Sequence, residues 1–102
     1  MKQVYIIGAV TGLPREEVVA KFEKAAYALK AGGMVPINPV NIVPEDANWN
    51  DAMRQCIKVL VTCDAVMLLP DWCESKGATL EVAIARNLDM PQFTQSLKYS
   101  KL

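Results

Sequence analysis

Four short apolar runs alternate along this chain with longer segments whose apolar residues recur at helical spacing. The runs cover residues 4–7, 34–37, 64–70 and 90–93, and the helical patterns cover about 15–31, 49–61 and 75–88. Strands that alternate with helices of this length are joined by right-handed crossovers, which make neighbouring strands parallel and place helices on both faces of the sheet. The alternation therefore predicts an α/β fold.

The predicted architecture is a three-layer α/β/α arrangement around a four-stranded parallel sheet with the strand order 2-1-3-4, a truncated flavodoxin-like or Rossmann-like fold. Pro36 places the second strand at an edge, because proline cannot donate a hydrogen bond to a sheet ladder. The 102 residues contain no internal repeat or linker, so we expect one domain over 1–102, with 96–102 as a tail.

Charge and hydropathy argue against several classes of partner. Eleven basic residues balance eleven acidic ones, so we expect no nucleic-acid partner and no binding to an anionic membrane surface. No apolar run reaches the roughly 18 to 20 residues that span a bilayer. The odd number of cysteines, three, and the lack of a secretory leader favour a cytoplasmic location.

The absence of histidine limits the chemistry that the chain can perform. The cysteines form no Cys-x-x-Cys pair, and without histidine a zinc site is not expected. We expect neither a metal site nor a cofactor. Dyads of serine or cysteine with histidine are excluded, which leaves carboxylates to carry any acid–base or nucleophilic step.

The segment from Asp64 to Glu81 is the strongest candidate for a functional site. It runs from an apolar strand through a polar loop into a helix start, and ligands of open parallel sheets gather at the carboxyl ends of strands. Ser75 stands at the expected N-cap, beside free backbone N–H groups. Gly77 and Glu81 lie one turn apart on one helix face, where the glycine would leave open space beside the carboxylate. The alternative is that Ser75 only caps the helix and that Glu81 is a solvated surface acid.

Several spaced blocks resemble a small bacterial and phage family of the nucleoside 2-deoxyribosyltransferase-like group. The resemblance covers about residues 2–93, and the combination of blocks is more specific than any one of them. The blocks are residues 8–14, 35–39, 49–54, 63–72 and 75–81.

The resemblance implies a reaction and a set of site residues. Glu81 matches the glutamate that acts as nucleophile in characterised members, and Ser75 matches a serine near the phosphate in members that act on nucleoside 5′-monophosphates. The loop with Gly8, Thr11 and Gly12 resembles the loop that covers the sugar. The implied ligand is a small-molecule nucleoside or nucleotide, and the implied reaction is N-glycosidic cleavage or deoxyribosyl transfer. An ionised glutamate can trap an oxocarbenium-like C1′, as in retaining glycosidases.

One departure from the family pattern concerns the acid that helps the base to leave. Many relatives carry an aspartate on the second helix where this chain has Cys56, and a thiol cannot replace a carboxylate there. Either another acid serves, with Asp51 and Asp71 as candidates, or turnover has been lost. The second possibility would make the protein a catalytically inactive nucleotide-binding or interaction module of the same fold.

Other polar and aromatic side chains have two interpretations each. Tyr5 could orient a carboxylate, although aromatic residues in strands are usually core. Trp72 could stack a base, Asp71 could accept a hydrogen bond from a sugar hydroxyl, and Trp49 is interpreted as a packing anchor. Asp64 begins a strand at its amino end and is interpreted as structural. Because so short a chain can enclose only part of such a ligand, we expect a homo-oligomer whose partner completes the pocket.

Overall fold

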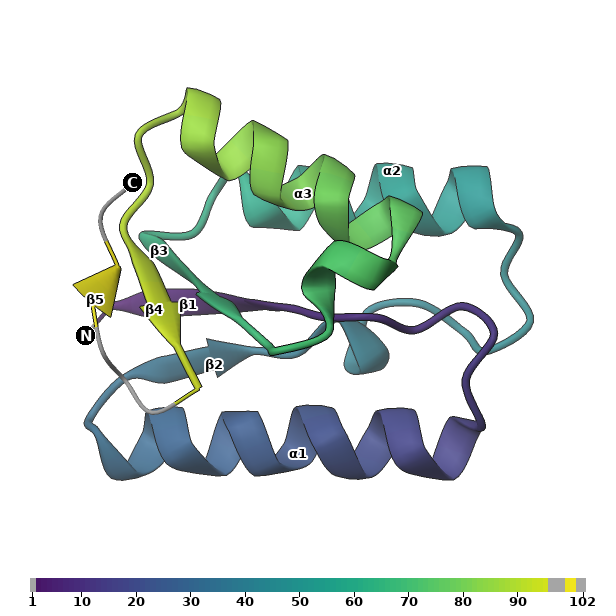
Figure 1. Cartoon of the computed structure of the whole chain (residues 1–102), viewed down its shortest axis with the longest axis horizontal. Coiled ribbons are helices and arrows are strands. Elements are labelled where there is room, and N and C mark those ends of the chain that lie inside the picture. Colours follow the sequence, from purple (N-terminus) through teal and green to yellow (C-terminus); the bar gives the residue numbers. More distant parts are fainter. Residues whose placement is uncertain (1, 96–98, 101–102) are drawn as a thin grey trace.

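A computed structural model describes residues 2–95, 99 and 100 of the chain, which form one sheet with helices on both faces (Figure 1). The sheet has the order β2-β1-β3-β4-β5. Its strands are β1 (Gln3–Ile7), β2 (Val35–Ile37), β3 (Ala65–Leu68), β4 (Gln92–Thr94) and β5 (Tyr99–Ser100). The helices are α1 (Arg15–Ala31), α2 (Trp49–Leu60) and α3 (Lys76–Asn87), with the short 3₁₀ helices η1 (Pro39–Asn41) and η2 (Trp72–Glu74).

The predicted parallel core of the sheet is confirmed. The first four strands are parallel in the order 2-1-3-4, and Pro36 lies in the edge strand β2. Strand β5 was not predicted: it pairs antiparallel with β4, in the region that the sequence indicated only as a tail. The other tail residues, 96–98, 101 and 102, lie outside the described residues.

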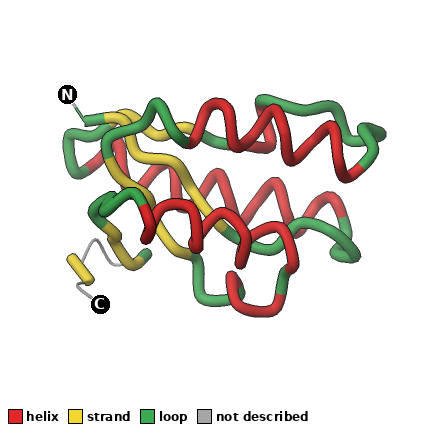
Figure 2. Tube along the Cα trace, turned by 90° about the horizontal axis from the view of Figure 1, so that it is seen from above, coloured by secondary structure: helices red, strands yellow, loops and turns green. Residues whose placement is uncertain are grey.

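The three layers follow from the two buried faces of β1. Val4 and Ile6 face the cluster formed with α1, whereas Tyr5 and Ile7 face the cluster formed with α2 and α3. Figure 1 shows α1 on one side of the sheet and the other two helices on the opposite side, and Figure 2 shows these two side by side. Successive strand residues point to opposite faces, so Tyr5 necessarily lies under α2 and α3.

Two of the helices begin at residue types that are preferred as N-caps, an asparagine and a serine, and Ser75 was predicted as such a cap. The side chain of Asn48 accepts a hydrogen bond from the backbone N–H of Asp51 at the start of α2, and that of Ser75 accepts one from Ala78 at the start of α3. Each cap satisfies one of the N–H groups that lack a partner in a helix's first turn. The two caps thereby fix the first turns of α2 and α3, beside the carboxyl ends of β1 and β3.

The inward face of α3 differs from the one expected. The helical spacing of the apolar residues in 75–88 predicts that Leu80, Ala83, Ile84 and Leu88 point inward. Ile84 is half-buried against the core, but the other three residues are exposed. The buried residues are Gly77, Ala78, Glu81, Val82 and Ala85. Small side chains allow a helix to approach a sheet closely, and this tight contact replaces the leucine stripe that the spacing suggested.

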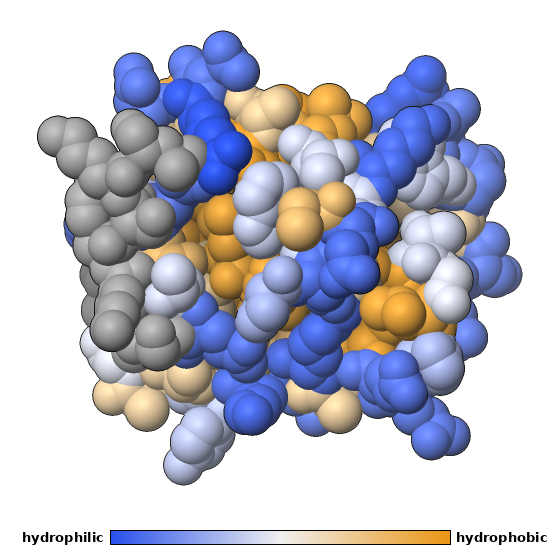
Figure 3. Space-filling view, in the orientation of Figure 1, coloured by the Kyte–Doolittle hydropathy of each residue, from blue (hydrophilic) through white to orange (hydrophobic). Residues whose placement is uncertain are grey.

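The molecular surface is mostly polar on the face shown in Figure 3, with apolar residues visible in separate patches between the polar ones. Exposed large apolar side chains include Val10 and Leu13 after β1 and Leu80 and Leu88 on α3. Within the part of the chain that the structure describes, no helix has both the length and the apolar character needed to cross a membrane.

Candidate functional site

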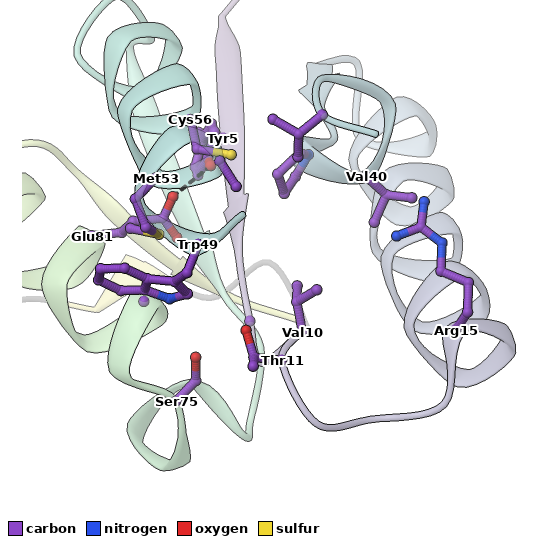
Figure 4. Close-up of a pocket in the computed structure, with 15 residues that line it drawn as sticks. Tyr5, Val10, Thr11, Arg15, Val40, Trp49, Met53, Cys56, Ser75 and Glu81 are labelled. Carbon is purple, nitrogen blue, oxygen red and sulfur yellow. Dashed lines mark hydrogen bonds between the residues drawn. The ribbon is translucent and has the colours of Figure 1, made fainter. Parts of the chain in front are cut away.

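A cavity of about 100 Å³ opens at the carboxyl end of β1, between the loop that follows this strand and the first turns of α2 and α3 (Figure 4). Its wall is largely apolar and comes from segments far apart in the sequence. Six of the residues predicted for the site line it: Tyr5, Gly8, Thr11, Ser75, Gly77 and Glu81. The other lining residues are Val10, Arg15, Pro39, Val40, Val43, Trp49, Ala52, Met53 and Cys56.

Glu81 is a buried carboxyl group in the wall of this cavity. Only 6% of its surface is exposed, and the hydroxyl of the fully buried Tyr5 donates a hydrogen bond of 2.5 Å to Glu81 Oε2. Burial raises the pKa of Glu81 to about 7, although the Tyr5 hydrogen bond lowers it in part. Burial, together with the nearby Glu81, also raises the pKa of Tyr5, so its hydroxyl remains a donor. The interpretation of Glu81 as a solvated surface acid does not hold.

Gly77 has a different role from the one the sequence suggested. A Cβ at this position would lie 3.0 Å from Met53 Sδ and 3.6 Å from Trp49 Nε1, so these side chains fill the space that was expected to be open. The glycine allows α2 to approach α3 beside Glu81. Figure 4 shows the Trp49 ring in front of Glu81, and the Lys76 ammonium lies 4.3 Å from the centre of that ring.

Cys56 points into the same cavity from α2. Its side chain is buried, and burial raises the pKa of its thiol, while a contact with Tyr5 lowers it in part. Burial near an anionic carboxyl disfavours the thiolate, so Cys56 is a neutral group at physiological pH. The cavity therefore pairs one carboxyl with one neutral thiol.

Asp71 lies outside the cavity and fixes the loop that covers it. Its Oδ1 accepts a hydrogen bond from the backbone N–H of Ala9 (3.1 Å), and its Oδ2 accepts one from Lys21 Nζ (2.6 Å). Lys21 also donates to the carbonyl oxygen of Ala9 (2.6 Å). Burial alone would raise the pKa of Asp71, but the Lys21 and Ala9 hydrogen bonds outweigh it and hold the pKa below its ordinary value. We call Lys21, Asp71 and the Ala9 peptide the loop clasp.

The remaining predicted residues also lie outside the cavity. Asp51 is exposed, and its carboxylate accepts a hydrogen bond from the Asn48 side chain at the start of α2 (2.8 Å). Trp72 packs against the core under α3, with the Arg86 guanidinium 5.1 Å from its ring centre. Gly12, with a φ of +84°, lines a groove that adjoins the cavity. The structural interpretation of Asp64 agrees with its contact, a hydrogen bond accepted from the Gln3 backbone (2.8 Å).

The adjoining groove is the part of the site that sequence reasoning missed. It has a volume of about 360 Å³ and shares Val10, Thr11, Arg15, Val43, Trp49 and Ala52 with the cavity. Its outer wall comes from the segment 43–47, which lacks the periodicity of a helix or strand, so no pattern in the sequence indicated its position. Arg15 stands where the two spaces meet, with its Nε 3.8 Å from a carboxylate oxygen of Glu45.

The described residues contain no group of three or more histidine, cysteine, aspartate or glutamate side chains that could hold a metal ion. The chemical groups that the cavity itself offers are the Glu81 carboxyl, the Tyr5, Thr11 and Ser75 hydroxyls and the Cys56 thiol, with the Arg15 guanidinium at its edge. A buried carboxyl in a sugar-sized apolar cavity can act as a nucleophile or as a hydrogen-bond partner for a bound hydroxyl.

Comparison with solved structures places the chain among the α/β proteins that share the fold of a deoxyribosyltransferase. The 2-desoxiribosyltransferase from Leishmania mexicana is similar with a TM-score of 0.68 and 17% sequence identity, over 100% of this chain and 80% of that one. A family model described as a domain of unknown function, DUF4406, matches residues 2–93, and the chain belongs to this family. A search of curated proteins gave no match. The fold that the nucleoside 2-deoxyribosyltransferase-like resemblance implied is thereby confirmed.

Proposed function

We propose that this protein binds a nucleoside or nucleotide at the carboxyl end of its sheet and cleaves or transfers the N-glycosidic bond through Glu81. The observation that carries this proposal is the Glu81 carboxyl itself, which is buried, faces a cavity and is held by the Tyr5 hydroxyl. Burial of a carboxylate is costly, so a glutamate without a role at this site would be expected at the surface. Strongly perturbed acids in clefts are candidates for functional sites.

The chemistry follows from the state of that carboxyl. With a pKa of about 7, a substantial fraction of Glu81 is ionised at neutral pH. An ionised oxygen attacks C1′ of the sugar from the face opposite the base, the C1′–N bond breaks, and a glycosyl ester forms on Glu81. Water or a second base then attacks C1′ and releases Glu81. The Tyr5 hydrogen bond orients the carboxyl and stabilises its ionised form.

The size of the site supports a ligand that extends beyond the cavity. The cavity of about 100 Å³ accommodates a pentose-sized group, and the adjoining groove of about 360 Å³ offers space for the base or another substituent. Two apolar walls of this groove, Val43 and Trp49, are shared with the cavity, so one ligand can occupy both.

The test measures, by chromatography, the release of free base from a panel of nucleosides with neutral and with cationic bases, and from their 5′-monophosphates. We expect release with the wild type and with Glu74→Gln, an exposed carboxyl in η2, and none with Glu81→Gln. Gln retains an oxygen for the Tyr5 hydrogen bond but cannot act as a nucleophile. Equal inertness of the wild type and Glu81→Gln on every substrate would refute the enzymatic proposal.

A second candidate function is ligand binding without catalysis, and Cys56 is the observation that favours it. A thiol lines the cavity at the position where the family resemblance implies an aspartate that helps the base to leave. Isothermal calorimetry distinguishes the two functions: heat of binding for a nucleotide, combined with no release of base over hours, would select the binding module.

A further inference from the structure

We infer that the substrates of this site are N-glycosides whose base carries a positive charge and leaves without being protonated, such as N-alkylated purine or pyridinium nucleosides. This inference rests on the proposed function and names its substrate class. It depends on one property of the cavity: a nucleophile is present, but a proton donor for the leaving base is not.

All eleven aspartate and glutamate side chains belong to the described residues, and the sequence contains no histidine. Glu81 is the single carboxyl in the cavity wall. As the nucleophile it lies on the face of the sugar opposite the base, so it cannot also protonate the base while the bond breaks.

The other polar groups in the wall do not replace such an acid. The Tyr5 hydroxyl already donates to Glu81, and burial raises the pKa of the Cys56 thiol, so this thiol is a much weaker proton donor than a carboxyl. A guanidinium such as that of Arg15 does not give up its proton in proteins. The aliphatic hydroxyls of Thr11 and Ser75 are far weaker acids than a carboxyl.

The carboxyl that lines the adjoining groove is that of Glu45. Its side chain is 69% exposed, and it faces the Arg15 guanidinium at 3.8 Å. Glu45 is therefore a charged rim residue rather than a buried acid aimed at a base.

A cationic base needs no donor because its charge is neutralised as it leaves. Glu81 supplies an electron pair to C1′, the electron pair of the C1′–N bond passes to the positively charged ring, and the base departs as a neutral molecule. Water then adds its oxygen to C1′ and restores the Glu81 carboxylate, with one proton released to solvent. A neutral purine would instead have to leave as an anion, which raises the barrier in an apolar cavity.

The electrostatics of the cavity also suit a cation. An anionic Glu81 in a largely apolar wall attracts a positive ring more strongly than it would in water. The Trp49 ring lines the cavity with Glu81, and a cation already contacts this indole: the Lys76 ammonium lies 4.3 Å from the ring centre. Arg15, the cation of the lining, lies on the opposite side of the cavity (Figure 4).

The test compares 7-methylguanosine with guanosine, a pair that differs in the charge of the base and keeps the sugar. Nicotinamide riboside serves as a second cationic probe, and reactions without protein correct for spontaneous hydrolysis. Because general acid catalysis is worth roughly 100-fold or more, we expect the wild type to release 7-methylguanine at least about 100 times faster than guanine. The release should be lost in Glu81→Gln.

Variants at Cys56 test the cause of this selectivity. Cys56→Asp supplies the missing acid, so the ratio between the two rates should fall by roughly tenfold or more. The ratio should persist in Cys56→Ser, which is similar in size and no acid, and in Glu45→Gln.

The outcomes separate this inference from the proposed function. Equal, Glu81-dependent release from guanosine and 7-methylguanosine would overturn the inference, but the proposed enzymatic function would remain. Binding of 7-methylguanosine without release would overturn the inference in favour of the binding module. Failure to bind or cleave any of the probes would overturn both.

Discussion

The buried carboxyl of Glu81 makes the stability of the protein depend on pH. Burial raises its pKa from an ordinary 4.5 to about 7, so the folded state holds a proton that the unfolded state has lost over this range. Stability is then fully present below about pH 4.5 and falls as the pH rises through about 7. Since each tenfold change in proton affinity corresponds to about 1.4 kcal/mol, the loss is on the order of 3 kcal/mol.

Glu81→Gln should remove this pH dependence and stabilise the protein in alkaline solution. The amide is neutral at every pH and can still accept the Tyr5 hydrogen bond. Urea unfolding at pH 5 and pH 8 measures the effect: we expect the wild type to lose about 2 to 3 kcal/mol between the two and the variant to change little. The exposed Glu74→Gln should behave as the wild type does. A wild type equally stable at both pH values would show that Glu81 titrates normally.

Sequence reasoning identified Glu81 and Tyr5 but could not decide how they are used. A lone glutamate on a helix can be a surface residue or a site residue, because its burial depends on which face of α3 meets the sheet. That face is set by the small side chains of Gly77, Ala78 and Ala85, whose low hydrophobicity gives a weak sequence signal. Asp71 was similarly ambiguous, since only the folded chain brings Lys21 to it.

At the scale of elements, the end of β1 is fixed by close contact with the residue that follows β3. A Cβ on Gly8 would lie 2.6 Å from Leu69 Cδ1, and Leu69 is fully buried. Gly8→Ala should therefore destabilise the protein by roughly 1 to 3 kcal/mol in chemical denaturation.

A double-mutant cycle with Leu69 checks the cause. Leu69→Ala removes the atoms that Gly8→Ala would strike, so the double variant should be less destabilised than the two single changes together, with a coupling of about 0.5 kcal/mol or more. Strict additivity would mean that the cost of Gly8→Ala does not come from this contact.

The loop clasp should control the mobility of the segment that covers the cavity. Asp71→Ala removes the acceptor of the Ala9 N–H, a hydrogen bond to a charged group that is worth about 1.5 to 3 kcal/mol. Amide exchange followed by NMR should then speed up at Ala9 by roughly tenfold or more. Glu17→Ala, at an exposed position in the first turn of α1, is the matched control. Unchanged exchange at Ala9 would show that the loop is held by other contacts.

The elements themselves were largely predictable because their ends carry local signals. Asn48 and Ser75 cap the starts of α2 and α3, and Gly32 and Gly33 end α1, so the helix bounds follow from short-range chemistry. The segment 43–47 and strand β5 were not predictable in this way. Their positions depend on contacts with distant parts of the chain, which leave no period in the sequence.

At the scale of the whole molecule, the site is small and open relative to its proposed ligand. A single chain measures 32 × 27 × 23 Å, and the cavity of about 100 Å³ passes into an open groove rather than a closed chamber. Binding sites for drug-sized ligands bury most of the ligand surface. A chain of this size can supply the Glu81 side of such a site and leave the other side to a second copy.

We therefore expect a homo-oligomer in which a neighbouring subunit completes the pocket. Sedimentation velocity should give a mass that is a multiple of 11.2 kDa, and small-angle scattering should give a radius of gyration well above the 12.3 Å of one chain. If the neighbour contributes to the site, nucleotide affinity per chain should fall on dilution below the dissociation constant of the assembly, because the binding-competent species is lost. A monomer at all concentrations, with affinity independent of dilution, would mean that one chain forms the complete site. Any remaining enclosure would then have to come from the segments around it, the loop held by the clasp and the residues 43–47 that form the outer wall of the groove.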